Sequence, residues 1–356
     1  MPPASFPSDK ITPKLFSGID NLSLDTRTFD PSRDDIKGIC RFFSLGKLQY
    51  YEKEKGIIVS HANFFVFVET TRGQYALKFY PTDAAKPIAI EYAINKILIN
   101  HHLPTPLMHA GPDGQPFLAS NDRLATCYSY IDGTPAWQQI KQRNTFPKIN
   151  AVLFSLKNIL STDLKHIPFL KQENLATTMN TLTQASRTWA GYDQKDIIDA
   201  SLLDACQTYH DHQPLFTRQY LHNNAHLNNF LIHKNFVYIL DLTHLREDYV
   251  LSDLTSLVTS CLFFNVPFTT IKTMVKNYFT QHKIGPDLMP LLNTLIKVGL
   301  IKEYLKNIKR EKSVKISNYP AGLMQTYLSH LSGRKELITA VLRKTPFIGA
   351  SANLVK

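Results

Sequence analysis

The first third of the chain has the pattern of an antiparallel sheet. Three short runs rich in aromatic and β-branched residues lie in KLQYYEKEKGIIVS, ANFFVFVETTRG and QYALKFYP, between residues 47 and 81. The second and third runs are joined at residues 71–73, where Gly73 can supply a positive φ. A helical pattern precedes the runs, with Ile36, Ile39 and Phe43 on one face. We expect a hairpin-rich sheet covered by this helix.

The remainder of the chain changes to mostly helical patterns. KPIAIEYAINKILINHHLP predicts a helix over residues 86–104, and a strand follows at 124–131 before the turn at Asp132 and Gly133. Further apolar spacings typical of helices occupy residues 149–161, 173–191, 195–212, 251–265, 268–282, 289–312 and 322–343. The chain is therefore expected to be an α+β protein with an extended leader at 1–31, a small lobe at 32–127 and a helical large lobe at 128–356.

One polar stretch interrupts the helical part and is the richest in candidate chemistry. Residues 218–257 contain the strand-like runs QYL, NFLI and FVYIL, separated by turn-rich polar segments. Polar side chains therefore fall at strand ends, where functional groups are commonly presented. These candidates are His222, Asn224, His226, Asn229, Asp241 and Asp253.

The string HNNAHLNNFL, followed about ten residues later by ILD, resembles the catalytic loop and metal-binding aspartate of the aminoglycoside phosphotransferase and choline kinase superfamily. That superfamily has a protein-kinase-like fold and a loop of the form H-G-D-x-H-x-x-N. The chain matches the form at His222, His226, Asn229 and Asp241. It departs at residue 223 and at Asn224, which stands where the family has its catalytic aspartate.

The resemblance implies a two-lobed kinase-like fold and roles for several residues. In such folds a strand lysine, here Lys78, holds the α- and β-phosphates of ATP or GTP and is positioned by a helix glutamate, here Glu91. Asn229 and Asp241 would hold Mg²⁺ through oxygen atoms, which suit a hard cation. His222 would brace the loop.

The same resemblance implies the remaining contacts of the nucleotide. No G-x-G-x-x-G is present, but the turn S-H-A-N, which contains Asn63, resembles the phosphate turn of homoserine kinase-like members. The segment around Tyr130 fits the hinge that binds the base. The acceptor would be a small hydroxyl- or amine-bearing molecule.

Asn224 leaves two functions open. A carboxamide cannot take a proton at neutral pH, and a general base typically contributes about 10²–10⁴-fold to a rate. The chain is either a phosphotransferase with weakened catalysis or a nucleotide-binding pseudokinase with a regulatory role. Glu247 and Asp248 could replace the base, but both are expected to be surface charges of a loop. Asp253 is expected to cap the helix that follows it.

Composition narrows the class of protein. With 44% hydrophobic and 19% charged residues among 356, the chain fits a folded protein of enzyme size. Its four cysteines form no C-x-x-C and fit reduced thiols in the cytoplasm. We expect no signal peptide, since the N-terminus lacks a basic and apolar segment, and no membrane span, because the most apolar run, 254–268, is too short.

Charge and histidine spacing raise two further alternatives. The net charge of +11 favours anionic ligands, but the basic residues are scattered, so nucleic acid is not the expected partner. The densest basic run, 302–315, fits the solvated face of a helix. His222 and His226 have the spacing of zinc-binding helices, although the sequence between them disfavours a helix and lacks the HExxH glutamate. Oligomeric state has no signature in the sequence.

Overall fold

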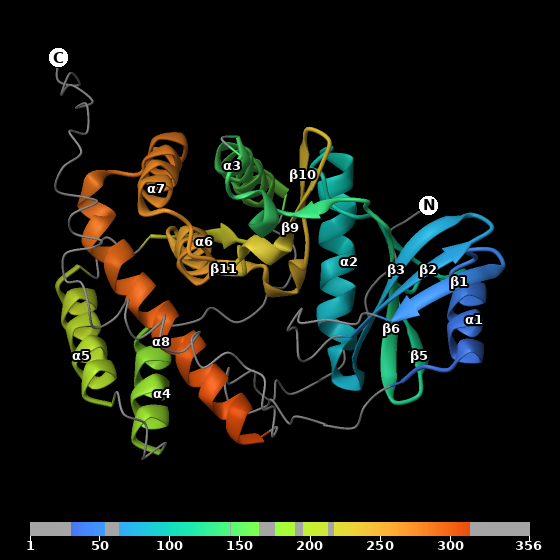
Figure 1. Cartoon of the computed structure of the whole chain (residues 1–356), viewed down its shortest axis with the longest axis horizontal. Coiled ribbons are helices and arrows are strands. Elements are labelled where there is room, and N and C mark those ends of the chain that lie inside the picture. The colour runs from blue at the N-terminus through green and yellow to red at the C-terminus, as the bar shows by residue number, and fades with distance from the viewer. Residues whose placement is uncertain are drawn as a thin grey trace.

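The computed structural model describes residues 30–53, 64–142, 144–163, 175–188, 195–212 and 217–313. Nearly all of the expected leader, the turn that contains Asn63 and the helix expected at 322–343 lie outside the described residues. The described chain forms a sheet-containing small lobe and a mostly helical large lobe, which confirms the expected α+β, kinase-like fold (Figure 1).

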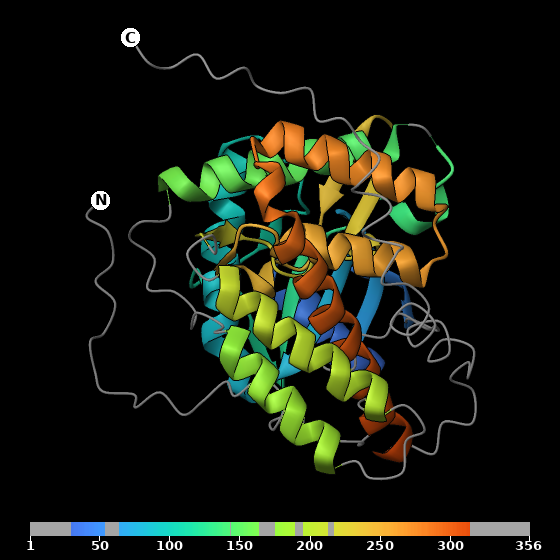
Figure 2. The ribbon, with the colours of Figure 1, turned by 90° about the vertical axis from the view of Figure 1, so that its left-hand side faces the viewer.

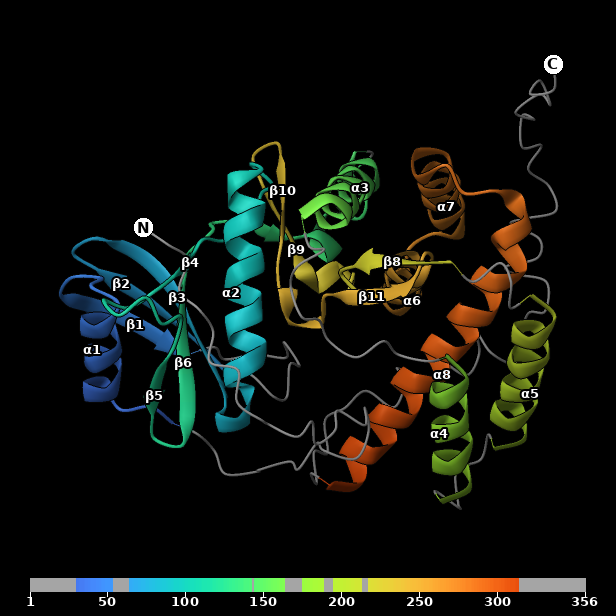
Figure 3. The ribbon, with the colours of Figure 1, turned by 180° about the vertical axis from the view of Figure 1, so that it is seen from behind.

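An antiparallel sheet forms the small lobe, with strand order β1-β2-β3-β6-β4 and with β5 also paired to β6. Helix α1 covers one face of it, and α2 lies between the sheet and the large lobe (Figures 1 and 3). The helices are α1 (Arg33–Phe42) and α2 (Ala85–Asn100), and the strands are β1 (Leu48–Lys53), β2 (Phe64–Thr70), β3 (Gly73–Pro81), β4 (Met108–His109), β5 (Leu118–Ser120) and β6 (Arg123–Ser129).

Strand register decides to which face of the sheet each side chain points. Val66, Leu77 and Cys127 lie opposite one another in β2, β3 and β6 and are buried with the apolar face of α1. Because side chains alternate along a strand, Lys78 points to the other face of the sheet. The apolar alternation of β3 thus fixes the direction of its lysine.

Helix α1 begins at a capping box. Ser32 accepts a hydrogen bond from the backbone N–H of Asp35, and the Asp35 carboxylate accepts one from the backbone of Ser32. Such reciprocal bonds satisfy two of the N–H groups that the first turn of a helix leaves open. The small lobe therefore has a defined first helix directly before its sheet.

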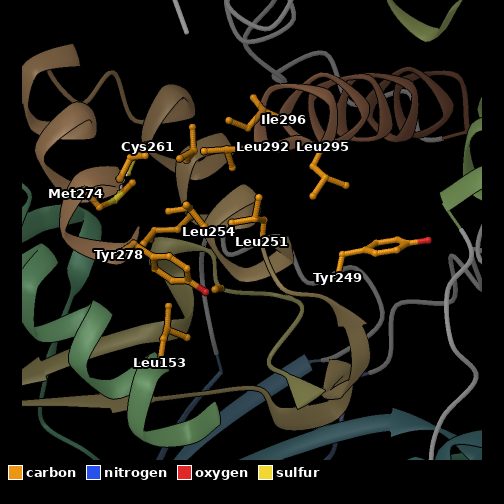
Figure 4. Close-up of a cluster of buried hydrophobic side chains, with 14 of the residues drawn as sticks. Leu153, Tyr249, Leu251, Leu254, Cys261, Met274, Tyr278, Leu292, Leu295 and Ile296 are labelled. Atoms are coloured by element: carbon orange, nitrogen blue, oxygen red, sulfur yellow. Dashed lines mark hydrogen bonds between the residues drawn. The ribbon is translucent and has the colours of Figure 1, made fainter. Parts of the chain in front are cut away.

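Helices and short strand pairs build the large lobe around one extended hydrophobic core (Figure 4). Strand β8 pairs with β11, and β9 pairs with both β10 and β7, all antiparallel. Helices α4, α5 and α8 pack together on the side away from the sheet (Figure 2). The elements are α3 (Thr145–Asp163), α4 (Leu175–Thr188), α5 (Lys195–His212), α6 (Ser252–Phe263), α7 (Phe268–His282), α8 (Met289–Ser313), β7 (Thr134–Pro135), β8 (Arg218–Leu221), β9 (Phe230–His233), β10 (Phe236–Ile239) and β11 (Arg246–Tyr249).

The segment after Asp241 differs from expectation. The sequence predicts a loop that exposes Glu247 and Asp248, but both residues lie in β11, paired with β8. Asp248 is buried; its carboxylate accepts hydrogen bonds from Arg246 and from the backbone N–H of Tyr249. Asp248 is therefore committed to a structural ion pair, and the surface role expected for it is wrong.

The helices of the described residues have no stretch that is both long and apolar enough to cross a membrane.

Candidate active site

Lys78 and Asp241 meet across the two lobes. Lys78 extends from β3 and is 3% exposed, and Asp241 follows β10. The Lys78 Nζ lies 2.9 Å from Asp241 Oδ1, so a partly buried ion pair joins residues 163 positions apart. Two residues to which the resemblance assigns phosphate and metal binding are therefore in contact where the lobes meet.

Asp241 is held by several donors. It has a left-handed backbone conformation, with φ of 57°, which turns its side chain out of the strand direction. Its Oδ1 also accepts a hydrogen bond from Thr243 Oγ1 at 2.7 Å, and its Oδ2 accepts one from Asn224 Nδ2 at 3.3 Å. Burial opposes ionisation, but the charge of Lys78, with further lowering effects from His244 and from the hydrogen bonds of Lys78 and Thr243, holds the pKa of Asp241 well below its ordinary value. Asp241 is thus a carboxylate at neutral pH.

The loop that carries Asn224 is braced by its own side chains. His222 is fully buried, with Nε2 donating to the Leu240 carbonyl at 2.8 Å and Nδ1 accepting from the Asn224 N–H at 3.2 Å. Asn229 Nδ2 donates to the Asn224 carbonyl at 2.7 Å, and the Asn229 carbonyl accepts from the Leu240 N–H. Asn224 and Asn229 are thereby fixed beside the residue that precedes Asp241.

Helix α6 anchors this loop from behind. Asp253 is fully buried and accepts hydrogen bonds from the backbone N–H groups of His222, at 3.1 Å, and Asn223, at 2.7 Å. Ser260, two turns further along α6, accepts from the Leu227 N–H at 2.9 Å. The helix-capping role expected for Asp253 is wrong: Leu251 is the N-cap, and the Asp253 carboxylate instead satisfies loop amides.

Glu91 has a different partner from the one expected. It is buried on α2, but its carboxylate accepts a hydrogen bond from the Tyr80 hydroxyl at 2.8 Å, whereas Lys78 pairs with Asp241. Burial raises the pKa of Glu91, against the lowering effect of the nearby Lys78 charge. The direct Lys78–Glu91 ion pair implied by the resemblance is therefore replaced by contacts through Tyr80.

Tyr130 lies just past the end of β6, at the connection between the lobes. Its N–H donates to the Gln74 carbonyl at 3.1 Å, and its half-exposed ring meets Phe67 of β2 edge to face at 5.5 Å. Its backbone donor is thus used within the small lobe, and its ring packs against β2. Asn63, the other residue expected at the nucleotide, lies outside the described residues.

A zinc site built on His222 and His226 does not fit the geometry. Both ring nitrogens of His222 are occupied by hydrogen bonds, and residues 222–226 form a loop rather than a helix. Among the residues that the structure describes, no three His, Cys, Asp or Glu side chains gather in a metal-binding cluster.

Sequence reasoning did not identify three residues that shape the site: Tyr80, Thr243 and Ser260. Tyr80 had a usable signal, since it lies two positions after Lys78 on the same strand and therefore on the same face. Ser260 bonds the backbone of Leu227, which belongs to another segment. Thr243 bonds Asp241 across a left-handed turn. Neither pairing has a periodicity that a single sequence reveals.

The comparisons agree with the fold. The structure defines a two-lobed, kinase-like protein whose cleft brings together a strand lysine and a loop aspartate. Residues 58–287 match the profile of the Phosphotransferase enzyme family, so the chain belongs to that family. Comparison with curated proteins finds no match.

Solved structures with the same fold include kinases of small molecules. An amicoumacin kinase in complex with AMP-PNP, Ca²⁺ and its ligand has a TM-score of 0.64 and 14% identity, over 89% of this chain and 95% of that one. An aminoglycoside phosphotransferase from Alicyclobacillus acidocaldarius has a TM-score of 0.63 and 11% identity, over 90% and 97%. A choline kinase from Cryptosporidium parvum has a TM-score of 0.60 and 15% identity, over 87% and 98%.

Proposed function

We propose that the chain transfers the γ-phosphoryl group of ATP, or of GTP, to a small hydroxyl- or amine-bearing molecule. The observation that carries this proposal is the meeting of Lys78 with Asp241 beside Asn224 and Asn229. Phosphoryl transfer asks the protein to neutralise phosphate charge and to orient the acceptor, and these side chains are of the types that do so. Structural neighbours bound to AMP-PNP, AMP and ADP support a nucleotide as donor.

The residues present fit a divalent cation such as Mg²⁺. Asp241 is ionised and about one-fifth exposed, and Asn229 uses its amide nitrogen on the loop, which leaves its side-chain oxygen for other contacts. Oxygen ligands of this kind suit Mg²⁺, which usually takes one or two protein ligands together with phosphate oxygens and water. We assign this role to Asn229 and Asp241; the cation would neutralise charge on the phosphates.

In the proposed reaction, the bond from the γ-phosphorus to the bridging oxygen breaks and a bond to the acceptor oxygen or nitrogen forms. ADP or GDP leaves. Asn224 can accept a hydrogen bond from the acceptor through its side-chain oxygen and so orient it, but the acceptor proton must pass to a phosphate oxygen or to water. A loose transition state places little demand on early proton removal, which makes such a route feasible.

A second candidate is favoured by the same residue. Asn224 donates its side-chain N–H to Asp241, so it serves the binding site in a way that a carboxylate could not. A chain that has the expected nucleotide-binding and metal-binding residues but lacks the catalytic base has the set of site residues of a pseudokinase. We therefore keep a nucleotide-binding regulatory role as the alternative.

Nucleotide binding is tested by thermal unfolding of the full chain. ATP with Mg²⁺ should raise the midpoint, because a ligand at about 100 times its Kd adds about 2.7 kcal/mol to stability. The increase should vanish in Asp241→Ala. No stabilisation of wild type by ATP or GTP would overturn both candidates.

Turnover separates the candidates. Release of ADP in the presence of a set of amino alcohols, amino acids and aminoglycosides, abolished by Lys78→Ala, would support the enzyme. Absence of turnover in wild type and its appearance in Asn224→Asp would support the pseudokinase.

The cysteines and the proposed acceptor bear on the location and partners of the protein. We propose a cytoplasmic protein, since Cys40, Cys127, Cys206 and Cys261 are all free thiols. Its partner would be the acceptor rather than nucleic acid. The lobe boundary would fall near residue 128, within the last strand of the small-lobe sheet.

A further inference from the structure

Tyr80 lies between Lys78 and Glu91 and contacts both. Its hydroxyl donates to Glu91 Oε2 at 2.8 Å, and the Lys78 Nζ lies 4.7 Å from the centre of its ring. All three residues are at most 3% exposed. A tyrosine whose two ends contact a cation and a carboxylate can transmit the position of one to the other.

The backbone fixes this geometry. Tyr80 follows Lys78 by two residues on β3, so the two side chains leave the same face of the strand. The Tyr128 hydroxyl, from the neighbouring β6, lies 3.2 Å from the Tyr80 hydroxyl. Two polar partners at its tip and a strand at its base leave the ring little freedom to turn away from Lys78.

Desolvation makes both contacts strong. A cation over an aromatic ring gains most where water is excluded, and a hydrogen bond to a charged group is stronger than a neutral one. Phe65, whose ring centre lies 5.7 Å from Lys78 Nζ, adds a second and more distant aromatic face. The ammonium of Lys78 is therefore surrounded by Tyr80, Phe65 and Asp241, and not by Glu91 directly.

We propose that Tyr80 is a positioning residue that holds Lys78 for the phosphates of the nucleotide, with Glu91 acting on the lysine through the Tyr80 hydroxyl. The ring supports the ammonium, and Glu91 keeps the ring in place. The nucleotide part of this proposal rests on the proposed function. The link between Lys78 and Tyr80 stands on the contacts alone.

The experiments must distinguish the positioning role of Tyr80 from a purely structural role. The ring also packs with Ile88, Met108 and Leu124 in a small buried cluster, so its truncation will lower stability in either case. A positioning role has a further consequence, because Lys78 would contact phosphates and not the base or ribose. Its loss should therefore affect nucleotides with phosphates more than adenosine.

The first experiment compares the affinities of AMP-PNP and adenosine, measured by calorimetry on the full chain. Tyr80→Leu removes both contacts, whereas Tyr80→Phe keeps the ring and removes the bond to Glu91. Tyr92→Leu is the matched control: Tyr92 packs against the same cluster from α2 and carries Lys96 over its ring at 5.1 Å.

Tyr80→Leu should bind AMP-PNP about fivefold to thirtyfold more weakly than wild type, as the loss of a desolvated cation–π contact implies. Tyr80→Phe should show a smaller loss, and Tyr92→Leu should show none. Adenosine affinity should stay within twofold in all three variants. Equal losses for adenosine and AMP-PNP, or no loss in Tyr80→Leu, would overturn the positioning role.

A second experiment does not depend on nucleotide binding. Unfolding of Lys78→Met, Tyr80→Leu and the double variant forms a cycle whose non-additivity measures the contact between the two side chains. We expect the double variant to lose clearly less stability than the two single losses added together. Additive losses would refute the link between Lys78 and Tyr80 even if the chain bound no nucleotide, and non-additive losses without nucleotide binding would refute only the proposed function.

Discussion

At the scale of single residues, Asn224 is the most informative side chain of the cleft. An aspartate at this position would place a second carboxylate close to Asp241, with an electrostatic cost in the absence of a cation. The carboxamide removes that cost and adds a hydrogen bond to Asp241 Oδ2 at 3.3 Å. Asn224 therefore stabilises the cation-free site, whatever its effect on turnover.

We predict that Asn224→Asp makes the fold depend more strongly on a divalent cation. With chelator present, the variant should lose about 1–3 kcal/mol of unfolding free energy, because a donor to a partly buried carboxylate is replaced by a like charge. With Mg²⁺ it should recover most of that loss. Chemical denaturation with EDTA and with Mg²⁺ measures both effects.

Asn228→Asp is the control for this prediction, since Asn228 lies in the same loop but is exposed. It should behave as wild type in both conditions. Equal stability of Asn224→Asp and wild type in EDTA would contradict the role assigned to the carboxamide.

At the same scale, the sequence offered candidate residues more readily than their contacts. Lys78, Asp241 and Asn229 were identified as candidates from strand alternation and from the resemblance to a family motif, both of which depend only on local order. The partner of Glu91 was not, since a carboxylate on a helix can reach either a lysine or a tyrosine of the facing strand. The position of the tyrosine hydroxyl decides between them, and it depends on the packing of α2 against β3.

At the scale of elements, the loop 222–229 depends on α6. Asp253 satisfies two backbone N–H groups of the loop from inside the core, where water cannot replace it. Burial raises the pKa of Asp253, against the lowering effect of nearby His222 and of these two hydrogen bonds. The first turn of α6 thus determines the shape of a loop thirty residues earlier in the chain.

Asp253→Ala should lower the unfolding free energy by about 2–5 kcal/mol, because it leaves two buried amides without an acceptor. Denaturant unfolding followed by tryptophan fluorescence measures the loss. Asp196→Ala is the control, as Asp196 is an exposed aspartate in the first turn of α5. A loss below about 0.5 kcal/mol in Asp253→Ala would show that the loop does not need this anchor.

Helix α7 introduces a pH dependence through His282. This side chain is 5% exposed, stacks on the fully buried Tyr278 at 3.8 Å, and has no hydrogen-bond partner at either ring nitrogen within the described structure. Burial, with a smaller effect from Lys157, lowers its pKa to about 3. The folded protein therefore keeps His282 neutral at pH values where the unfolded chain protonates it.

The sign of the pH effect follows from proton counts. Between the unfolded pKa of about 6.5 and the folded pKa of about 3, the unfolded state binds more protons, so stability falls as pH falls. His282→Phe keeps the stacked ring and should flatten this slope by about 1.4 kcal/mol per pH unit. Unfolding free energies at pH 7, 6, 5 and 4 test this, with the exposed His210→Phe as control. An unchanged slope in His282→Phe would contradict it.

Helices were predictable because their apolar spacing extends over many residues, and α3, α5, α6, α7 and α8 begin or end within a few residues of expectation. Strand β11 was not. Arg246, Glu247 and Asp248 have the composition of an exposed loop, and only pairing with β8 and the ion pair of Arg246 with Asp248 makes them a strand. The three charged residues in a row made this segment resemble an exposed loop, so strand β11 was not predicted.

At the scale of the whole molecule, the order of elements was enough to predict two lobes, but not how they meet. A sheet followed by helices predicts the lobes because each must bury an apolar face. Their contacts include the ion pair between Lys78 of β3 and Asp241 of the large lobe, the hydrogen bond of Thr105 to the Ile239 carbonyl at 3.0 Å, and apolar side chains of α2 in the core of the large lobe. Such contacts join positions more than a hundred residues apart.

Lys78→Met should loosen the lobes more than it unfolds either one. The substitution leaves the Asp241 carboxylate without its cation while Asn224 and Thr243 still donate to it, so the cost should be about 3–5 kcal/mol at the cleft. We expect faster amide exchange in β3 and around residues 240–245, with little change in α5 and α8. Hydrogen exchange followed by mass spectrometry locates the effect.

The control is Lys297→Met, which removes an ion pair with Asp204 that lies wholly within the large lobe. That pair is partly exposed, so its loss should cost at most about 1 kcal/mol and should leave exchange in the cleft unchanged. Uniform faster exchange across both lobes in Lys78→Met would mean that the ion pair supports global stability. Exchange confined to the cleft would instead mean that Lys78 and Asp241 hold the lobes in the closed arrangement, and that a nucleotide which binds Lys78 must separate this pair as it enters.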